Sequence, residues 1–298
     1  MKKLDYGKLA TEQSNPRSAR IDCASVEQIL AILNREDRSV PAAVGRARPQ
    51  IARGVRLIVA SLQSGGRLFF AGAGTSGRLG VLEAAECPPT FNTPPSLIQA
   101  FMAGGKSAVF QSKEGAEDRR DEGARMIRLK ARKADVVVGI AASGVTPFVG
   151  GALAAARALK AKTILITCAD ARLFRHLADC IIAVRVGPEV ISGSTRLKAG
   201  TATKLVLNML TVTSMVRLGK VYRNWMVDLQ PKSLKLRARA LRLVTRLGEV
   251  PEKDAAHYLK QARGHAKLAI LMARRKWNFR TAERKLTQAA GFLEKALR

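Results

Sequence analysis

The sequence has few of the residues from which metal sites and disulfide frameworks are built. Its 298 residues include three histidines and four cysteines. No two cysteines form a CxxC pair, and no Cys/His cluster has the spacing of a zinc site. Cys168 and Cys180 lie in apolar runs, where a cysteine acts as a small hydrophobic side chain. The sequence therefore argues against a metal site and against a histidine-based triad.

Long apolar runs are absent as well. No window approaches the ~18–20 apolar residues that a membrane-spanning helix needs. The charged N-terminus, residues 1–6, is not followed by the apolar segment of a signal peptide. The hydrophobic fraction of 47% is nevertheless sufficient for a sizeable core. We therefore expect a cytoplasmic protein with no membrane partner.

Acidic residues are scarce. There are 23 Asp and Glu against 52 Lys and Arg, a formal net charge of +29, and such an excess first suggests a polyanionic partner. Residues 232–298 carry +13 and residues 1–231 the remaining +16, while aromatics are 5% of the chain and do not interleave with a basic run. This distribution favours a solvated basic surface, and the charge alone leaves nucleic-acid binding open.

Short, nearly continuous apolar runs alternate with helical patterns in the middle of the chain. Such runs are typical of strands buried on both faces. The predicted strands are residues 68–71, 97–101, 136–141, 163–168 and 180–186. The alternation indicates an α/β fold: a doubly wound, five-stranded parallel sheet, an α-β-α sandwich of the flavodoxin-like kind. Such sheets bind ligands at the carboxyl ends of their strands.

Helices are predicted around this sheet. Ser25 and Gln28 form a capping box before one helix, and a second helix ends at Gly65 and Gly66. Further helices are predicted over residues 147–160 and 199–218 and as several short amphipathic helices in 232–298. The predicted division is N-terminal helices in 1–64, a ligand-binding domain in 65–220 and a small helical subdomain in 221–298.

A glycine-rich loop, GAGTSGR at residues 72–78, lies between the first strand and a helix. It matches the G-x-G-x-x-G dinucleotide fingerprint, but the stretch near the next strand, 96–101, lacks the acidic residue that would bind a ribose. A phosphate site is the alternative, because Gly74 and Gly77 allow close approach and Thr75 and Ser76 offer hydroxyls at a helix N-terminus. A turn without a ligand is the third interpretation.

A second hydroxyl-bearing loop, ASGVTP at residues 142–147, follows the third strand. Ser143, Gly144 and Thr146 could complete a phosphate site, although a Ser or Thr before Pro also caps helices. Two such loops at one sheet edge are more specific than either alone.

Three further polar segments lie at the predicted ends or starts of helices and strands. Glu86 lies in AECPPT (85–90), where Pro88 and Pro89 are expected to end the helix, and it is either an acid/base or a solvated glutamate. Glu117 lies in EGAED (114–118), which also fits an ordinary acidic helix start. The segment 187–201 opens the long helix and is either the edge of a site or a set of capping residues.

Together these segments resemble the N-acetylmuramic acid 6-phosphate etherase family, whose members have a sugar isomerase (SIS) domain. The resemblance rests on GAGTSGR, AECPPT, EGAED, ASGVTP and STRLKAGT (194–201) in that order, and it extends from about residue 11 into the helical tail. It implies cofactor-free cleavage of a lactyl ether, giving N-acetylglucosamine 6-phosphate and D-lactate. It also implies a homodimer with sites near the subunit interface.

The resemblance implies roles for particular residues. Glu86 matches the family's acid/base glutamate, and Glu117 matches the second catalytic glutamate, to which we assign removal of the C2 proton. The expected phosphate-binding residues are Gly74, Thr75, Ser76, Gly77, Ser143, Gly144 and Thr146. Ser194 and Lys198 are expected at the edge of the site.

Two features depart from the family pattern. Its second phosphate loop commonly reads SGRTP, and here Val145 replaces the arginine. The charge of +29 is also unusually high for the family. The alternatives are a non-catalytic sugar-phosphate sensor related to glucokinase regulatory protein, an aldose–ketose isomerase, which would not need AECPPT, and a SIS-type transcriptional regulator, for which residues 1–64 offer little room.

Overall fold

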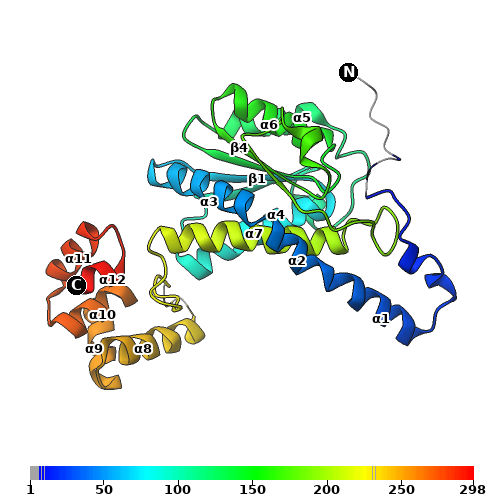
Figure 1. The fold of residues 1–298 in the computed structure, drawn as a ribbon. Helices are drawn as coiled ribbons and strands as arrows, with labels where there is room; N and C mark the ends of the chain where they lie inside the picture. Colours follow the sequence, from blue (N-terminus) through cyan, green and yellow to red (C-terminus); the bar gives the residue numbers. More distant parts are fainter. Residues whose placement is uncertain (1–6, 8, 10, 230, 232) are drawn as a thin grey trace. The chain divides into compact units, whose positions relative to one another are not determined.

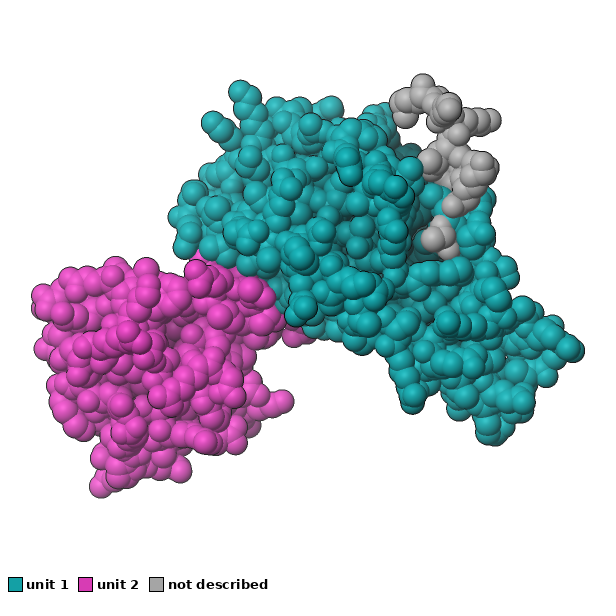
Figure 2. All heavy atoms as spheres, viewed as in Figure 1, with its two compact units in different colours: residues 1–84, 96–211 teal, residues 85–95, 212–298 magenta. Residues whose placement is uncertain are grey.

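The computed structural model describes residues 7, 9, 11–229, 231 and 233–298. The N-terminal segment 1–6, judged above not to begin a signal peptide, lies outside the described residues. The described chain forms two compact units (Figure 2). One comprises residues up to 84 together with 96–211, and the other comprises 85–95 and 212–298. The boundaries after residues 84 and 211 fall inside helices, the third falls after residue 95, and the three-part division made from the sequence stays a prediction.

The first unit contains the expected parallel sheet. Its strands are β1 Leu68–Gly72, β2 Ile98–Met102, β3 Val136–Ile140, β4 Lys162–Thr167 and β5 Cys180–Ala183. All pairs are parallel, and the order is β2-β1-β3-β4-β5. Strands β1 and β4 are labelled in Figure 1. The predicted α/β class and five-stranded sheet are confirmed, although β5 ends three residues earlier than expected.

Helices cover both faces of this sheet. The helices of the first part of the chain are α1 Val26–Asp37, α2 Ser39–Arg46, α3 Arg48–Gln63, α4 Gly74–Phe91, α5 Arg120–Lys130, α6 Pro147–Ala158 and α7 Lys198–Arg217. Short 3-10 turns occur at Pro16–Ser18, Ile21–Cys23, Lys106–Val109 and Ala171–Phe174. The capping box of Ser25 and Gln28 is present at the start of α1.

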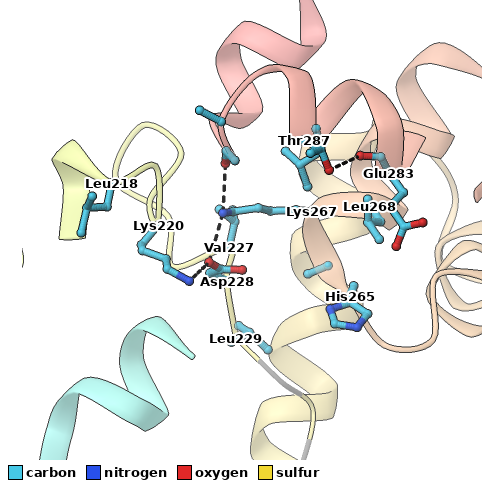
Figure 3. A pocket seen from close by; sticks show the side chains of 14 residues that line it. Leu218, Lys220, Val227, Asp228, Leu229, His265, Lys267, Leu268, Glu283 and Thr287 are labelled. Atoms are coloured by element: carbon cyan, nitrogen blue, oxygen red, sulfur yellow. Dashed lines mark hydrogen bonds and ion pairs between the residues drawn. The ribbon is translucent and has the colours of Figure 1, made fainter. Parts of the chain in front are cut away.

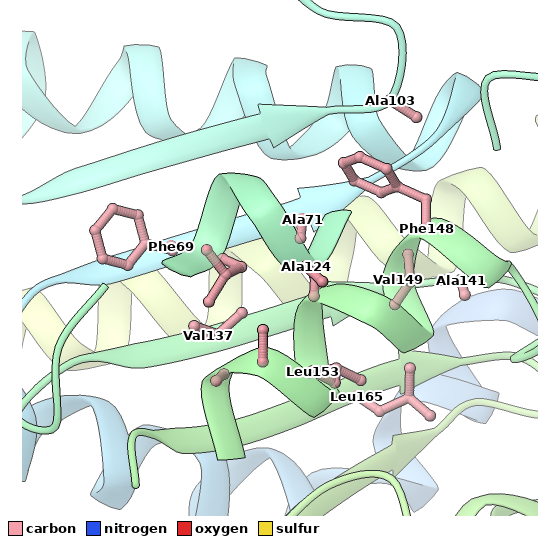
Figure 4. Close-up of a cluster of buried hydrophobic side chains, with 14 of the residues drawn as sticks. Phe69, Ala71, Ala103, Ala124, Val137, Ala141, Phe148, Val149, Leu153 and Leu165 are labelled. Atoms are coloured by element: carbon pink, nitrogen blue, oxygen red, sulfur yellow. The ribbon is translucent and has the colours of Figure 1, made fainter. Parts of the chain in front are cut away.

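One face of the sheet packs against α5 and α6. Alternate residues of the central strands, such as Phe69, Val137 and Leu165, are fully buried there with Phe148 and Leu153 of α6 (Figure 4). The opposite face carries Phe70 and Ile164. A Cβ at Gly80 of α4 would lie 3.0 Å from Phe70, and one at Gly54 of α3 would lie 3.5 Å from Ile164. Period-two burial on both faces explains why the strands read as continuous apolar runs.

Helix α4 departs from the sequence prediction. Pro88 and Pro89 were expected to end it, but the helix continues to Phe91, and the N–H of Asn92 still donates to the carbonyl of Pro88 at 2.9 Å. The prolines occupy the last turn. Each removes one backbone donor, while its φ remains compatible with a helix. The chain leaves the helix at Asn92, which has φ +52°.

The second unit has a hydrophobic core of its own. Beyond α7 its helices are α8 Leu234–Gly248, α9 Glu252–Gln261, α10 Ala266–Arg275, α11 Phe279–Gln288 and α12 Leu293–Leu297. Helix α10 is central, because its residues from Ala266 to Ala273 are all buried and it contacts α8, α9, α11 and α12. The prediction of several short amphipathic helices after residue 232 is therefore confirmed.

Candidate active site

The two hydroxyl-bearing loops leave neighbouring strands at the same edge of the sheet. Gly72 ends β1 and pairs with Ile140, which ends β3. The first loop leads into α4 and the second into α6. The crossovers from β1 and β3 run to opposite sides of the sheet, as the order β2-β1-β3-β4-β5 requires. This is the switch point at which doubly wound sheets bind ligands.

The first loop is built for close approach to a ligand. Gly74 has φ +53°, is exposed, and would have no atom within 4 Å of an added Cβ. Thr75 and Ser76 follow in the first turn of α4, half-buried, where backbone N–H groups lack helical partners. A Cβ at Gly200 of α7 would lie 3.6 Å from the Thr75 methyl group. The start of the STRLKAGT helix therefore packs beside this loop.

The second loop is shaped by Gly144. This residue has φ +80°, and a Cβ there would lie 2.4 Å from the ring of Phe174. The Ser143 hydroxyl oxygen accepts a 3.4 Å hydrogen bond from the N–H of Val145. Thr146 is the N-cap residue of α6, but its side chain makes no capping hydrogen bond. The alternative interpretation of this loop required the Thr146 hydroxyl to cap α6. The hydroxyl makes no such hydrogen bond.

Glu117 is joined to the second loop through the backbone. The N–H of Phe148, in the first turn of α6, donates to the carbonyl oxygen of Glu117 at 2.9 Å. The Glu117 side chain is exposed. It lines a cavity of about 200 Å³ with Gly74 of the first loop and with the basic residues Arg78 and Lys113. The structure therefore brings Glu117 and both loops to one region.

Glu86 belongs to the second compact unit, unlike Glu117 and the two loops. It is exposed on α4, in the residues 85–95 that belong to the second compact unit. Its catalytic role stays a prediction. One turn earlier, Glu83 is buried and accepts a hydrogen bond from the hydroxyl of Thr211 on α7. The sequence analysis singled out Glu86 through the AECPPT motif and did not mark Glu83, three residues earlier on the same helix, as a buried carboxylate.

The loop before α7 contains a buried carboxylate that the sequence analysis missed. Glu189 is 1% exposed and accepts hydrogen bonds from the N–H groups of Lys198 (2.9 Å) and Ala199 (2.8 Å). Burial raises the pKa of Glu189, and these two hydrogen bonds oppose that rise. A glutamate, rather than Ser or Thr, thus satisfies the start of α7. Ser194 is half-buried in the intervening loop.

The Lys198 side chain is held by an ion pair. Its ammonium lies 2.7 Å from Glu36 of α1, and both side chains are 3% exposed. Asn15 and Arg17 also donate to Glu36, at 2.8 and 3.2 Å. Burial alone would raise the pKa of Glu36, but these hydrogen bonds lower it to about 2. Lys198 lines a separate cavity of about 480 Å³ with these residues, so its contact with substrate stays a prediction.

The second unit contains a larger cavity of about 550 Å³, which includes none of the predicted site residues (Figure 3). Lys267 is buried beside it and donates to the carbonyls of Gly219 (2.8 Å) and Gly291 (3.1 Å), and Asp228 lies 3.1 Å away. Burial lowers the pKa of Lys267, whereas Asp228 opposes this. Three acceptors match the three N–H bonds of the ammonium, so Lys267 acts as a cross-link.

The described residues offer neither a metal-binding cluster nor a membrane-spanning helix. No group of three or more His, Cys, Asp or Glu side chains is placed to hold a metal ion among residues 7, 9, 11–229, 231 and 233–298. Within the same residues, no helix has the length and hydropathy needed to span a bilayer.

Two family models match parts of this chain. Residues 50–157 match the glucokinase regulatory protein N-terminal SIS domain, and residues 119–213 match the SIS domain. Among solved structures, the phosphoheptose isomerase GmhA from Neisseria gonorrhoeae is 17% identical, with a TM-score of 0.46, and the match covers 63% of this chain and 97% of that one.

Sequence relatives are much closer. N-acetylmuramic acid 6-phosphate etherase from Geobacillus thermodenitrificans is 47% identical over 97% of this chain and 98% of the relative. The etherase from Salinibacter ruber is 49% identical and etherase 2 from Vibrio cholerae 48% identical, each over 97% of this chain and 94% of the relative. By this similarity along nearly its whole length, the chain belongs to the N-acetylmuramic acid 6-phosphate etherase family.

Proposed function

We propose that this protein cleaves the lactyl ether of N-acetylmuramic acid 6-phosphate, a carbon–oxygen lyase reaction that yields N-acetylglucosamine 6-phosphate and D-lactate. The observation that best supports this proposal is that two hydroxyl-bearing loops and Glu117 lie in one region, at the switch point of the sheet. The family membership supports the choice of substrate.

The phosphate would be bound by the two loops. Thr75, Ser76, Ser143 and Thr146 offer hydroxyls, and the first turns of α4 and α6 offer backbone N–H groups together with the positive ends of their dipoles. Gly74 is exposed and would let the backbone approach the anion, whereas Gly77 lets α4 pack against Gly72 of β1 and Gly144 makes room for the Phe174 ring. Binding at one end would leave the sugar chain free to extend toward the cavity that contains Glu117.

The chemistry requires one base, one acid and no cofactor. In the open-chain aldehyde, the carbonyl at C1 acidifies the C2 proton, which Glu117 removes. The electron pair forms the C2–C3 double bond as lactate leaves from C3, protonated by Glu86. Water activated by Glu86 then adds to C3, and a proton returns to C2. General acid–base catalysis of this kind contributes typically 10²–10⁴-fold for each group.

We also propose a cytoplasmic homodimer that acts in the recycling of cell-wall sugar. Helix α7 exposes three large apolar side chains at helical spacing, Met209, Val212 and Val216, with exposed fractions of 38–46%. A second copy of the chain would cover such a stripe. Ser194 lies in the loop before α7, whose first turns pack beside Thr75, so we assign it to the edge of the phosphate site.

The test is D-lactate release from N-acetylmuramic acid 6-phosphate by the purified protein. We expect turnover by the unmodified protein and at least ~10²-fold slower turnover by Glu86→Gln and Glu117→Gln. Unchanged rates in both variants would defeat the mechanism. Tight sugar-phosphate binding by an unmodified protein that releases no lactate would favour a regulatory protein instead.

A further inference from the structure

The cavity beside Glu117 contains a cation that the reaction described above does not use. Lys113 lines this cavity four residues before Glu117. Its aliphatic stem lies over the turn at Gly104, where a Cβ would lie 3.1 Å from the lysine Cδ. Its ammonium donates one hydrogen bond, to the carbonyl of Gly104 at 3.0 Å. Among the described residues no carboxylate pairs with it, so two N–H bonds remain for a ligand.

The other basic side chain of the cavity has less freedom. Arg78 donates from Nε to the carbonyl of Val109 (2.9 Å) and from Nη2 to the carbonyl of Ala108 (3.0 Å). These bonds hold its guanidinium against the backbone of the 3-10 turn Lys106–Val109. The second loop adds no cation, because its position 145 is a valine, which packs against the hydrophobic core. Lys113 is therefore the cation of this cavity that can turn toward a bound anion.

The proposed substrate contains two anions, a phosphate on C6 and the carboxylate of the lactyl group. The ether oxygen of that group is bonded to C3, next to the C2 carbon on which Glu117 would act. The phosphate is four carbons away from C2. Lys113 is four residues from Glu117 and lines the same cavity, so we expect its ammonium to bind the carboxylate. The two hydroxyl-bearing loops would bind the phosphate.

We propose that Lys113 binds the lactyl carboxylate and so makes the site selective for sugar phosphates that carry an acid at C3. This inference rests on the proposed function. Lys113 would also offset the charge of Glu114 and Glu117, which line the same cavity and would otherwise repel an anionic group.

The experiment compares two ligands that differ in the lactyl group. KM for N-acetylmuramic acid 6-phosphate and the inhibition constant of N-acetylglucosamine 6-phosphate are measured for the unmodified protein, Lys113→Met, Lys113→Arg and the control Lys106→Met. Lys106 is an exposed lysine of the neighbouring turn and does not line the cavity. Melting temperatures verify that each variant is folded.

We expect Lys113→Met to raise KM about tenfold, corresponding to the loss of one charge-assisted hydrogen bond. The inhibition constant of the sugar without the lactyl group should change less than twofold, Lys113→Arg should restore most of the affinity, and Lys106→Met should resemble the unmodified protein. Equal weakening of both ligands, or no change in either, would overturn the assignment.

Failure of the proposed function is a separate result, because it is read in the unmodified protein as an absence of D-lactate. In that case, calorimetric titration with the same two sugars still measures the contrast. A Lys113→Met variant that loses affinity only for the acid-bearing sugar supports the role of Lys113, and equal affinities in all proteins refute it.

Discussion

The N–H of Phe148 donates a 2.9 Å hydrogen bond to the carbonyl oxygen of Glu117. Phe148 is fully buried in the first turn of α6, directly after the loop that contains Ser143 and Thr146. The position of Glu117 is therefore set by the same helix start that we expect to bind the phosphate, which couples the binding of one end of the substrate to chemistry at the other.

The two glutamates should be separable by isotope exchange. If Glu117 removes the C2 proton, Glu117→Gln should suppress exchange of that proton with deuterated water, because proton removal precedes every later step. Glu86→Gln should slow lactate release while exchange continues. Proton NMR of the substrate in D₂O measures both. Asp118→Asn, an exposed neighbour that does not line the cavity, is the matched control. Persistent exchange in Glu117→Gln would transfer the base role to another group.

Gly144→Ala should destabilise the protein by about 2–3 kcal/mol and weaken phosphate binding. The substitution combines a left-handed backbone with a Cβ 2.4 Å from the ring of Phe174. Gly187→Ala separates these effects, because Gly187 has φ +73° with no atom within 4 Å of an added Cβ, and it should cost only about 1 kcal/mol. Urea unfolding measures the loss of stability in each variant. Equal losses in Gly144→Ala and Gly187→Ala would show that Phe174 moves away without penalty.

The Glu36 carboxylate should make stability depend on acid pH. Its pKa is lowered from 4.5 to about 2, so its ion pair stabilises the folded state above the unfolded pKa. That contribution, on the order of 3 kcal/mol, should be lost as the pH falls from about 4.5 toward 2. The Glu36→Gln protein should have a lower free energy of unfolding at neutral pH, and this free energy should fall less on acidification. Parallel pH profiles for the two proteins in denaturant titrations would contradict this.

Cysteine reactivity should single out Cys23. It is exposed, whereas Cys87, Cys168 and Cys180 are buried. Burial and the nearby charge of Glu189 raise the pKa of the Cys168 thiol to about 12, so almost no thiolate forms near neutral pH. Mass spectrometry after iodoacetamide treatment at pH 8 should show one fast modification, at Cys23, and the buried thiols should react only after denaturation. Fast labelling of Cys168 in the folded protein would refute this.

The apolar stripe on α7 should control the oligomeric state. Val212→Asp introduces a charge in the middle of the exposed side chains Met209 and Val216. We expect it to yield a monomer by light scattering with unchanged far-UV circular dichroism. Leu129→Asp is a suitable control, since Leu129 is 69% exposed on α5 and lies outside the stripe. A dimer that survives Val212→Asp would place the interface elsewhere.

The sheet and the helices around it could be predicted from local patterns along the chain. Strands β1 to β4 lie within a residue of their predicted bounds, because residues buried on both faces of a parallel sheet leave a continuous apolar run that is visible locally. The order of strands and loops along the chain also made it possible to predict that Ser143 and Thr75 would meet at one edge. The main errors were at the ends of two elements: β5 stops three residues early, and α4 continues through two prolines that fit within its last turn.

Tertiary structure decided which polar side chains became partners. Lys198 and Glu36 are 162 residues apart, and no local pattern marks either as the partner of the other. The partners of Glu189 and Lys113 are only nine or ten residues away, but their sequence neighbourhoods resemble an ordinary capping segment and an ordinary charged turn. Apolar periodicity is a local property of a helix or strand. The partner of a charge depends instead on which distant segments the topology brings together and on how far they exclude water.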